Sequence, residues 1–476
     1  MNNFCNNFSP ATNRRDLLKS VAGGFGYLAL ADLLSQESRA AKPNRKANPL
    51  APREPHFEPK AKRVIFLFMH GGPSQVDTFD YKPQLIKDHG KPLPFDKPRV
   101  FSGSTGNLLK SPFKFNQHGE SGAWVSEIFP QIAKHVDDMC IINGIHGSNS
   151  RHGGAAMELH NGSDTFVRPS MGSWINYGLG TENQDLPGYI TVCPTLTHGG
   201  GNLFTSAFLP AAYAGTPLGN AATASDKAQI PFIHNAQKTP LKRQRRELDF
   251  LQDLNRSRLD GTGPDAGLEG RINSFELAFR MQQAAPAIQD VAGEPKSMLE
   301  MYGIDNPKTR DFGWQCLMAR RFAESGVRFV QVSHSYKWDQ HANLKSSHTN
   351  NAAEVDQPIA ALLTDLKSRG LLDDTLVLWG GEFGRTPVAQ GNDGRDHNPQ
   401  GYTMWLAGGG VKGGIRYGET DEYGYFAVKD KVHLHDLHAT MLHLLGLNHL
   451  KLTYRYGGRD YRLTDIAGEI VHDIIA

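Results

Sequence analysis

Short, almost purely apolar segments that stop at glycine, proline or histidine constrain the fold of this chain more than any other feature. The clearest occupies residues 64–69 and ends at His70-Gly71-Gly72-Pro73. A strand that is buried on both faces of a parallel sheet has this appearance. Similar segments lie at residues 139–145, 189–192, 328–332, 375–379 and 402–406.

Helical patterns lie between these segments. Val355, Ile359, Leu362 and Leu366 recur at helical spacing, and Gly370 follows them where a helix commonly ends. Another such pattern covers residues 312–322, just before the apolar segment at 328. This alternation predicts an α/β fold, a three-layer α/β/α sandwich with a mostly parallel central sheet. Ligands of such sheets bind outside the carboxyl ends of the strands.

Composition narrows the classes of protein. The 476 residues are 39% hydrophobic, which is ordinary for a globular chain, and the net charge of +2 makes nucleic acid an unexpected partner. Cys5, Cys140, Cys193 and Cys316 form no CxxC pair, so we expect neither a disulfide framework nor a cysteine metal site. The chain is unusual in its high numbers of histidine (20) and glycine (50).

The first 40 residues have the features of a twin-arginine signal peptide. Arg14-Arg15 precedes an apolar run, and Ser38-Arg39-Ala40 is a small-residue cleavage pattern. An amphipathic terminal helix is the alternative. The run is too short and too rich in glycine to span a bilayer, so no integral membrane segment is expected after removal of the leader. We expect a periplasmic or extracellular protein.

The rest of the chain divides by composition into a linker and a folded domain. Residues 41–62 contain five prolines among basic residues and indicate an extended linker. The folded domain is then 63–476. A less apolar helical insert is expected at about 215–300, with helices near 241–259 and 268–283. The basic run at 242–246 lies on the first of these helices and is interpreted as a solvated face.

Polar residues gather where the predicted strands end. The segment after the first strand brings His70 and Asp77, and the segment after the strand at 139 brings Ser148, Ser150, Arg151 and His152. Hydroxyl, imidazole and guanidinium groups are suited to nucleophilic attack and to binding an oxyanion.

Three further segments repeat this arrangement. Asp339 and His341 follow the strand at 328 and are spaced for one side of an extended chain. Glu382 follows the strand at 375, and His397 precedes the strand at 402. The last segment, 433–438, has three histidines, but its Asp436 is equally suited to be a helix N-cap.

Two short segments resemble familiar functional motifs, but their surrounding sequence does not support those functions. His70-Gly71-Gly72 resembles the oxyanion-hole segment of lipases, but the chain has no G-x-S-x-G elbow. Gly408, Gly410 and Gly413 have dinucleotide-site spacing, but further glycines follow where that site needs a helix. Neither a serine esterase nor a dinucleotide-binding protein is favoured.

Several of these segments together resemble a known family. HGGPSQVDTFD at 70–80, GGEFGRTP at 380–387, GRDHNP at 394–399 and HDLHATMLHLLGL at 435–447 resemble the exported bacterial proteins of domain-of-unknown-function family 1501. The resemblance runs from about residue 63 to the end. It implies an alkaline-phosphatase-like fold and kinship with the alkaline phosphatase and sulfatase superfamily.

The resemblance also implies roles for individual residues. Glu382 falls where the superfamily has a metal-binding aspartate, and Phe383 replaces the histidine that follows it. His70 stands where relatives carry the first metal-binding aspartate, which Asp77 would replace. The segment 150–162 resembles the one that bears the sulfatase nucleophile, but the sequence needed for formylglycine is missing, and His152 lies near that place.

These observations lead to a functional hypothesis. We expect an exported metal-dependent hydrolase of phosphate or sulfate esters, with a sulfated or phosphorylated glycan as one candidate substrate. The mixed nitrogen and oxygen donors favour one or two Zn²⁺ or other first-row ions. The expected metal ligands are His70, Asp77, Asp339, His341, Glu382 and His397. The expected catalytic residues are Ser148, Ser150, Arg151 and His152. The alternative is a non-catalytic relative that binds surface polysaccharide or a protein partner.

Overall fold

The computed structural model describes residues 50–96, 106–231, 233, 239–263 and 265–476. The predicted signal peptide, Cys5 and residues 41–49 of the predicted linker lie outside the described residues. The chain divides into two units, residues 1–48 and 49–476, and the second contains every described element.

A nine-stranded sheet lies at the centre of this unit, in the order β12-β4-β11-β8-β1-β7-β5-β6, with β15 also paired to β4. Only β11 runs antiparallel to its neighbours in this sheet, so the prediction of a mostly parallel sheet is confirmed. The strands are β1 (Arg63–Met69), β4 (Met139–His146), β5 (Tyr189–Val192), β6 (Thr216–Leu218), β7 (Phe329–His334), β8 (Thr375–Gly380), β11 (Tyr402–Ala407), β12 (Ile415–Tyr417) and β15 (Val432–His433).

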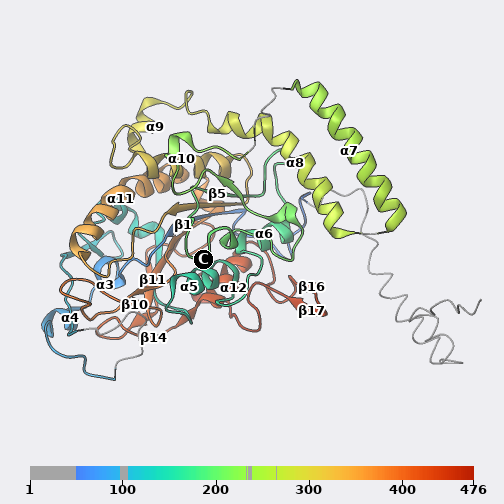
Figure 1. The fold of residues 1–476 in the computed structure, drawn as a ribbon. Coiled ribbons are helices and arrows are strands. Elements are labelled where there is room, and N and C mark those ends of the chain that lie inside the picture. Colours follow the sequence, from blue (N-terminus) through green and yellow to red (C-terminus); the bar gives the residue numbers. More distant parts are fainter. Residues whose placement is uncertain (1–49, 97–105, 232, 234–238, 264) are drawn as a thin grey trace, which may run out of the picture. The chain divides into compact units, whose positions relative to one another are not determined.

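The central strands are apolar on both sides because helices cover both faces of the sheet. Figure 1 shows α10 and α11 on one face and α5, α6 and α12 on the other, which confirms the three-layer α/β/α sandwich. The bounds of these helices are α5 (His152–Asn161), α6 (Met171–Leu179), α10 (Arg310–Glu324), α11 (Leu344–Ser368) and α12 (Leu434–Leu444).

The remaining elements connect or border this sandwich. The helices are α3 (Gln75–Thr78), α4 (Pro83–Lys87), α7 (Leu241–Thr262), α8 (Ala266–Gln289) and α9 (Lys296–Met301). The paired strands are β2 (Phe115–His118) with β3 (Ala123–Ser126), β9 (Gly384–Arg385) with β10 (His397–Asn398), β13 (Glu419–Thr420) with β14 (Ala427–Lys429), and β16 (Tyr454–Tyr456) with β17 (Arg459–Tyr461).

The segment expected as a helical insert contains both sheet and helix. β6 lies inside it and extends the central sheet beside β5. α7 and α8 form a helical pair, and α8 continues through Pro286 instead of stopping before it. Among the described residues, no helix combines the length and the apolar character needed to cross a bilayer. Cys140, Cys193 and Cys316 are buried free thiols.

The register of the sheet aligns the ends of its central strands. Met69 in β1 pairs with His334 in β7, and Phe68 pairs with Gly380 in β8. The loops that follow these three strands therefore begin side by side at one edge. Because β11 is antiparallel, its first residues lie at this same edge. The fold thus brings together loops that are hundreds of residues apart in sequence.

Candidate metal centre

This edge of the sheet positions the side chains of the site. His70 directly follows β1, Asp339 lies in the loop after β7, and Glu382 follows β8. His152 is the first residue of α5, in the connection after β4. His397 begins β10, shortly before the antiparallel β11. His70, Glu382, His152 and His397 thus lie at the end of a strand or helix or directly after it, whereas Asp339 lies within the loop between β7 and α11.

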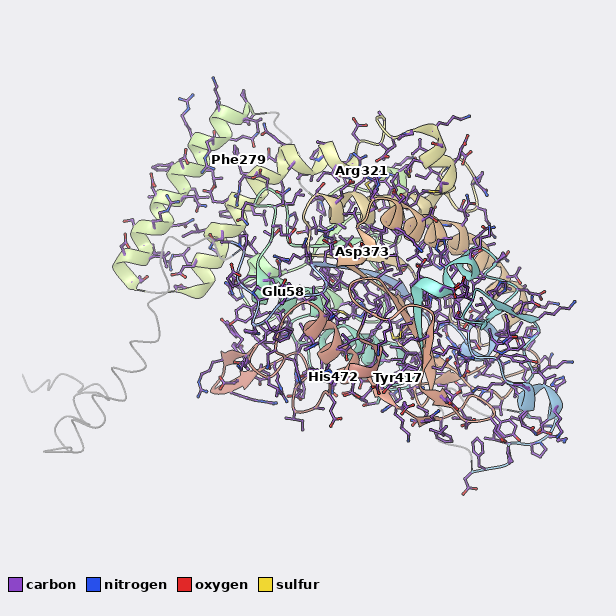
Figure 2. All side chains as sticks on the ribbon, turned by 180° about the vertical axis from the view of Figure 1, so that it is seen from behind. Glu58, Phe279, Arg321, Asp373, Tyr417 and His472 are labelled. Atoms are coloured by element: carbon purple, nitrogen blue, oxygen red, sulfur yellow. The ribbon has the colours of Figure 1, made fainter. Side chains whose placement is uncertain are left out.

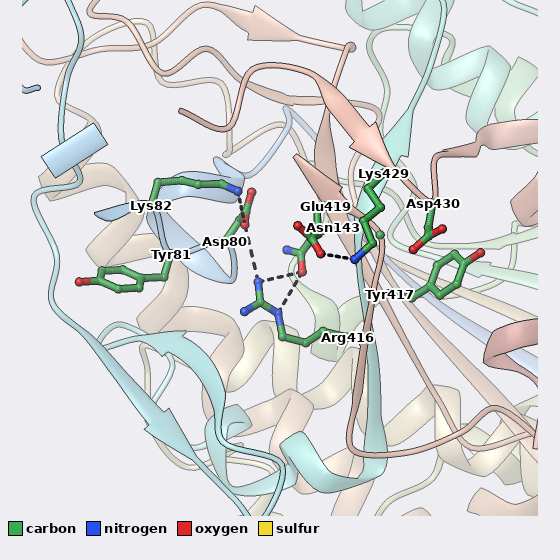
Figure 3. Close-up of a pocket in the computed structure, with 10 residues that line it drawn as sticks. Asp80, Tyr81, Lys82, Asn143, Arg416, Tyr417, Glu419, Lys429 and Asp430 are labelled. Carbon is green, nitrogen blue, oxygen red and sulfur yellow. Dashed lines mark hydrogen bonds and ion pairs between the residues drawn. The ribbon is translucent and has the colours of Figure 1, made fainter. Parts of the chain in front are cut away.

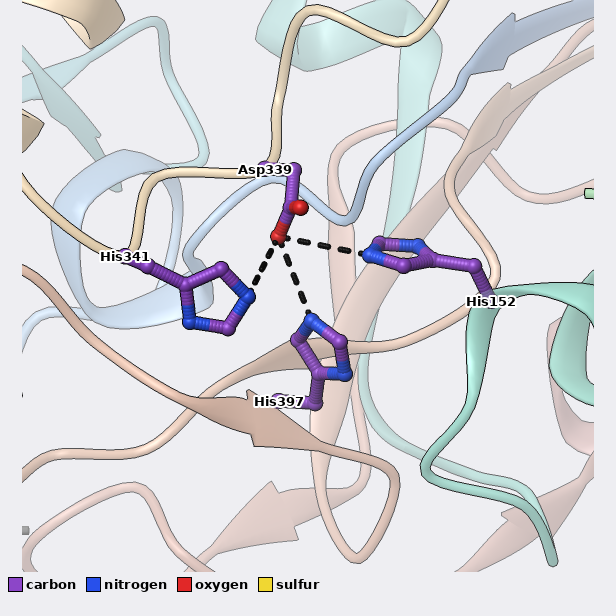
Figure 4. Close-up of side chains that lie close together, drawn as sticks. All are labelled: His152, Asp339, His341 and His397. Carbon is purple, nitrogen blue, oxygen red and sulfur yellow. Dashed lines mark hydrogen bonds and ion pairs between the residues drawn. The ribbon is translucent and has the colours of Figure 1, made fainter. Parts of the chain in front are cut away.

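Four side chains converge on one point. His152, Asp339, His341 and His397 offer ligand atoms that all lie within 4.8 Å of one another (Figure 4). Asp339 Oδ1 is the shared contact, 2.9 Å from His341 Nε2, 3.2 Å from His397 Nε2 and 3.3 Å from His152 Nε2. The lone pairs of three ring nitrogens and one carboxylate oxygen repel one another at these distances. Protons on the rings or a bound cation can supply the positive charge that this arrangement needs.

The opposite nitrogen of each ring is held by an oxygen. His397 Nδ1 donates to the Ser150 carbonyl at 2.7 Å, and His152 Nδ1 contacts Glu382 Oε1 at 2.6 Å. His341 Nδ1 contacts the side-chain oxygen of Gln390. Outer partners of this kind fix the ring and leave the Nε2 lone pair for a metal, which is the usual arrangement around metal-binding histidines. The three rings are therefore oriented for coordination.

A second group shares His152 with the first. His70, His152 and His198 each place a ring nitrogen within 4.8 Å of the others. The His70 ring is fully buried, and neither of its nitrogens has a hydrogen-bond partner among the described residues. Burial lowers the pKa of His70 to about 4. A buried imidazole with two unsatisfied nitrogens is costly unless a ligand satisfies it.

Electrostatics keep the two acids of the site ionised. Burial opposes ionisation of Asp339, but hydrogen bonds from His152, His341 and His397 hold its pKa far below the usual range. Burial also opposes ionisation of Glu382, whose pKa is nevertheless lowered to about 2 by His70 and His152. Although burial opposes protonation of His152, hydrogen bonds with both acids raise its pKa. The site therefore concentrates negative charge among imidazoles.

Arg385 ties the surrounding loops together. Its guanidinium is fully buried and donates to Asp339 Oδ1 at 2.7 Å and to the Trp338 carbonyl at 3.0 Å. It also donates to the carbonyl of Gly72 at 3.0 Å. Arg385 thus joins the loops after β1, β7 and β8, and its charge is balanced by Asp339 within the protein.

Phe383 packs against the histidines of the site. Its ring is stacked on His397 with centroids 4.4 Å apart, and it lies 4.8 Å from the His152 ring. Phe383 therefore helps to orient the two histidine rings by packing against them, and it supplies no atom that could coordinate a metal.

Two residues that the sequence predicted as metal ligands lie in neither group. Asp77 is fully buried and pairs with Arg395, with Arg395 Nε 2.7 Å from Asp77 Oδ2. Glu382 contacts His152 and accepts the Gly71 N–H at 3.0 Å. The other four predicted ligands, His70, Asp339, His341 and His397, belong to one group or the other.

The predicted catalytic residues are divided among different tasks. His152 belongs to both groups. Ser150 contributes its backbone carbonyl, and Arg151 is the exposed residue that precedes α5. Ser148 Oγ lies 3.3 Å from His433 Nε2, but His433 Nδ1 already accepts the His435 N–H. Neutral His433 therefore carries its proton on Nε2 and cannot take one from Ser148.

Four residues of the site were not predicted from the sequence: His198, Tyr336, Gln390 and Arg385. His198 follows β5, and Tyr336 Oη donates to Asp339 Oδ2 at 2.9 Å. A signal for His198 is present in the sequence, since all three histidines of the second group precede two glycines, in His70-Gly71-Gly72, His152-Gly153-Gly154 and His198-Gly199-Gly200. No comparable pattern marks Tyr336 or Gln390.

A polar pocket of about 310 Å³ lies elsewhere, between the segment after α3 and the strands β4 and β12. Asp80, Lys82, Asn143 and Arg416 form one side of it (Figure 3). Lys82 Nζ lies 3.1 Å from Asp80 Oδ1, and Lys429 pairs with Glu419 at 2.6 Å. These charges neutralise one another, so the pocket offers no net charge to a ligand.

The chain belongs to a protein family that a sequence-based family model recognises. The family described as Protein of unknown function (DUF1501) matches residues 61–475, which is nearly the whole folded unit. None of the curated proteins compared with the chain matches it.

Three of the solved structures that are similar to the chain are an enzyme of lipoteichoic acid synthesis, a sulfatase and an alkaline phosphatase. The lipoteichoic acid synthase LtaP from Listeria monocytogenes has 10% identity and a TM-score of 0.37, over 85% of this chain and 75% of that one. The PsFucS1 sulfatase from Pseudoalteromonas sp. has 13% identity and a TM-score of 0.33, over 83% and 68%. The alkaline phosphatase from the Antarctic bacterium TAB5 has 9% identity and a TM-score of 0.33, over 81% and 98%.

Proposed function

We propose that this protein is an exported metal-dependent hydrolase of phosphate or sulfate esters. The observation that carries the proposal is the convergence of two histidine groups on His152, one of which contains the buried and unsatisfied ring of His70. Protons could balance the charge of Asp339, but they leave His70 Nδ1 without a hydrogen-bond partner, and His70 Nε2 lies 3.8 Å from Glu382 Oε1, beyond hydrogen-bond distance. A bound cation would satisfy both groups.

The donor set defines the kind of cation. His152, His341, His397 and Asp339 would hold one ion, and His70 and His198 could hold a second beside it. Imidazole and carboxylate donors favour Zn²⁺ or another first-row ion over Mg²⁺. When bound, such an ion polarises an ester oxygen and lowers the pKa of water.

The protein offers its own groups to the anionic part of a substrate. The amino end of α5 begins at His152, so its first N–H groups and the helix dipole favour an oxyanion there. A side chain added at Gly153 would meet no atom within 4 Å, so the first turn is open to a ligand. Arg151 lies at the start of this turn and is suited to brace the anion.

Neither serine that the sequence predicted as a nucleophile is activated by a base. Ser148 faces the protonated nitrogen of His433, and Ser150 takes part through its carbonyl. We therefore expect water, rather than a serine hydroxyl, to attack the ester. Replacing either serine by alanine should leave the rate of hydrolysis within about threefold of wild type. If a serine were the nucleophile, its replacement would lower the rate by several orders of magnitude.

Elemental analysis combined with hydrolysis assays tests the proposal. Purified protein should contain a first-row metal and should cleave aryl phosphates or aryl sulfates, and His397→Ala should lose both properties. His472→Ala, which removes an exposed histidine, is the matched control. Metal without hydrolysis of either ester would favour the non-catalytic binding protein, and absence of metal from the wild-type protein would refute the proposal.

Export by the twin-arginine route is a separate part of the proposal. It rests on Arg14-Arg15, the apolar run and the small-residue pattern ending at Ala40. Fractionation of cells that express the full chain should place the protein outside the cytoplasm. Replacing Arg14 and Arg15 with lysine should retain it inside, and unchanged export would contradict this route.

A further inference from the structure

The helix α7 has an inner side that packs against α8. Gln252 is its buried residue, and Gln252 Nε2 donates to the Ile272 carbonyl at 2.7 Å. Arg245 pairs with Glu276 at 2.8 Å, and its guanidinium lies 5.0 Å from the centre of the Phe279 ring, which Figure 2 labels. The partly or fully buried residues of α7 follow helical spacing: Gln244, Arg245, Leu248, Gln252, Asn255 and Leu259.

The outer side of α7 exposes large apolar side chains. Phe250 is 68% exposed, Leu254 is 54% exposed and Leu251 is 40% exposed. Phe250 and Leu254 are four residues apart and lie about half a turn from the inner stripe, so they share one surface. Single exposed apolar residues are common, but a contiguous group of them on one helix face marks a surface that binds something.

Arginines share this outer side. Arg243, Arg246 and Arg258 lie there. Glu247 lies among them, 2.8 Å from Arg243 Nε, and exposed Asp253 lies at the border and pairs with Arg256 at 3.3 Å. Within the described part of the chain, neither Arg246 nor Arg258 forms an ion pair. The face therefore combines two apolar side chains, Phe250 and Leu254, and Leu251 at its border, with an excess of positive charge.

A second copy of the chain fits this face poorly. In an antiparallel pair of α7 helices that packs Phe250 on Leu254 of the other copy, Arg246 of one copy would face Arg258 of the other. A parallel pair would place each arginine against itself. Like charges brought together at an interface are unfavourable, so the charge pattern calls for an anionic partner.

We propose that the outer face of α7 docks on an anionic lipid surface. Phe250, Leu251 and Leu254 would enter the boundary between headgroups and acyl chains, while Arg243, Arg246 and Arg258 reach the phosphates. Helices with this combination of apolar and basic side chains lie in the plane of a membrane surface. This docking does not depend on the chemistry of the metal centre.

Flotation of the full-length protein with vesicles tests the docking. Binding should occur on vesicles of phosphatidylcholine with phosphatidylglycerol and should be at least about tenfold weaker on phosphatidylcholine alone. The double variant Phe250→Ser/Leu254→Ser and the double variant Arg246→Gln/Arg258→Gln should each weaken binding by about tenfold or more. High salt should weaken the binding of wild type as well.

Matched controls keep the result interpretable. Ile466→Ser removes an apolar side chain that is 85% exposed elsewhere, and Lys345→Gln removes an exposed charge on α11; both should bind like wild type. Circular dichroism verifies that each variant is folded. Equal binding to both vesicle types, or no binding, would overturn the proposal. So would a dimer in light scattering that Phe250→Ser/Leu254→Ser dissociates, because a second copy would then occupy the face.

Discussion

At the scale of single residues, the histidines of this protein differ by what holds each ring. His397 and His152 have one nitrogen fixed by an oxygen acceptor and the other aimed at Asp339. His70 has no hydrogen-bond partner within the described structure. His433 instead caps α12 and accepts a backbone N–H. The same side chain is therefore a candidate ligand in one place and a structural cap in another, and only its neighbours distinguish the two.

Gln390 is expected to act as a positioning residue for metal binding. Its side-chain oxygen contacts His341 Nδ1, so Gln390→Leu should free the ring and weaken metal affinity by about 10-fold to 100-fold. Gln390→Glu keeps an acceptor and should restore affinity. Competition with a chromogenic chelator measures the change, and the exposed Gln400→Leu is the control. Equal affinities for Gln390→Leu and wild type would show that this contact does not orient the ring.

At the scale of elements, close approach of loops builds the site. Gly71 has φ +117°, and a Cβ at this position would lie 2.7 Å from the Asp339 backbone nitrogen and 2.8 Å from the Trp338 backbone. The loop after β1 can therefore touch the loop after β7 only because it lacks a side chain. Arg385 then ties these two loops to the one after β8.

Gly71→Ala should therefore disrupt the site. We expect a loss of about 2 kcal/mol in the free energy of unfolding and a loss of bound metal, because both the positive φ and the contact with Asp339 are incompatible with a side chain. Gly153→Ala is the matched control, since this glycine also follows a histidine but lies in a helix with open space around it. The control should be neutral or stabilised by up to about 1 kcal/mol in urea unfolding. Similar stability and metal content of the two variants would contradict this account.

At the scale of the whole molecule, the stability of the fold should depend on pH through Asp356. This carboxylate on α11 accepts the N–H groups of Gln131 and Ile132 at 2.8 Å, yet burial raises its pKa to about 6. A carboxyl whose pKa is higher in the folded state stabilises the fold most at low pH and loses that contribution as the pH rises through about 6.

Between pH 5 and pH 8, this single group should lower the free energy of unfolding by about 1 kcal/mol. Urea unfolding of wild type and Asp356→Asn at both pH values measures the difference, with chelator present so that metal does not contribute. The variant should lose that part of the pH dependence, whereas Asp373→Asn, at an exposed carboxylate, should keep it. An unchanged pH dependence in Asp356→Asn would disprove the assignment.

Apolar runs such as residues 64–69 and the helical pattern that ends at Gly370 report burial directly, so the class of fold could be predicted from them. The sequence also placed His70, Asp339 and His397 near strand ends, since a strand that stops at a polar residue marks the edge of a sheet. It could not decide which polar residues meet: Asp77 pairs with Arg395, while His198 joins His70 and His152. Those pairings depend on strand order and on the distances between loops. Neither leaves a pattern in the neighbouring residues, so the pairings are visible only in the folded chain.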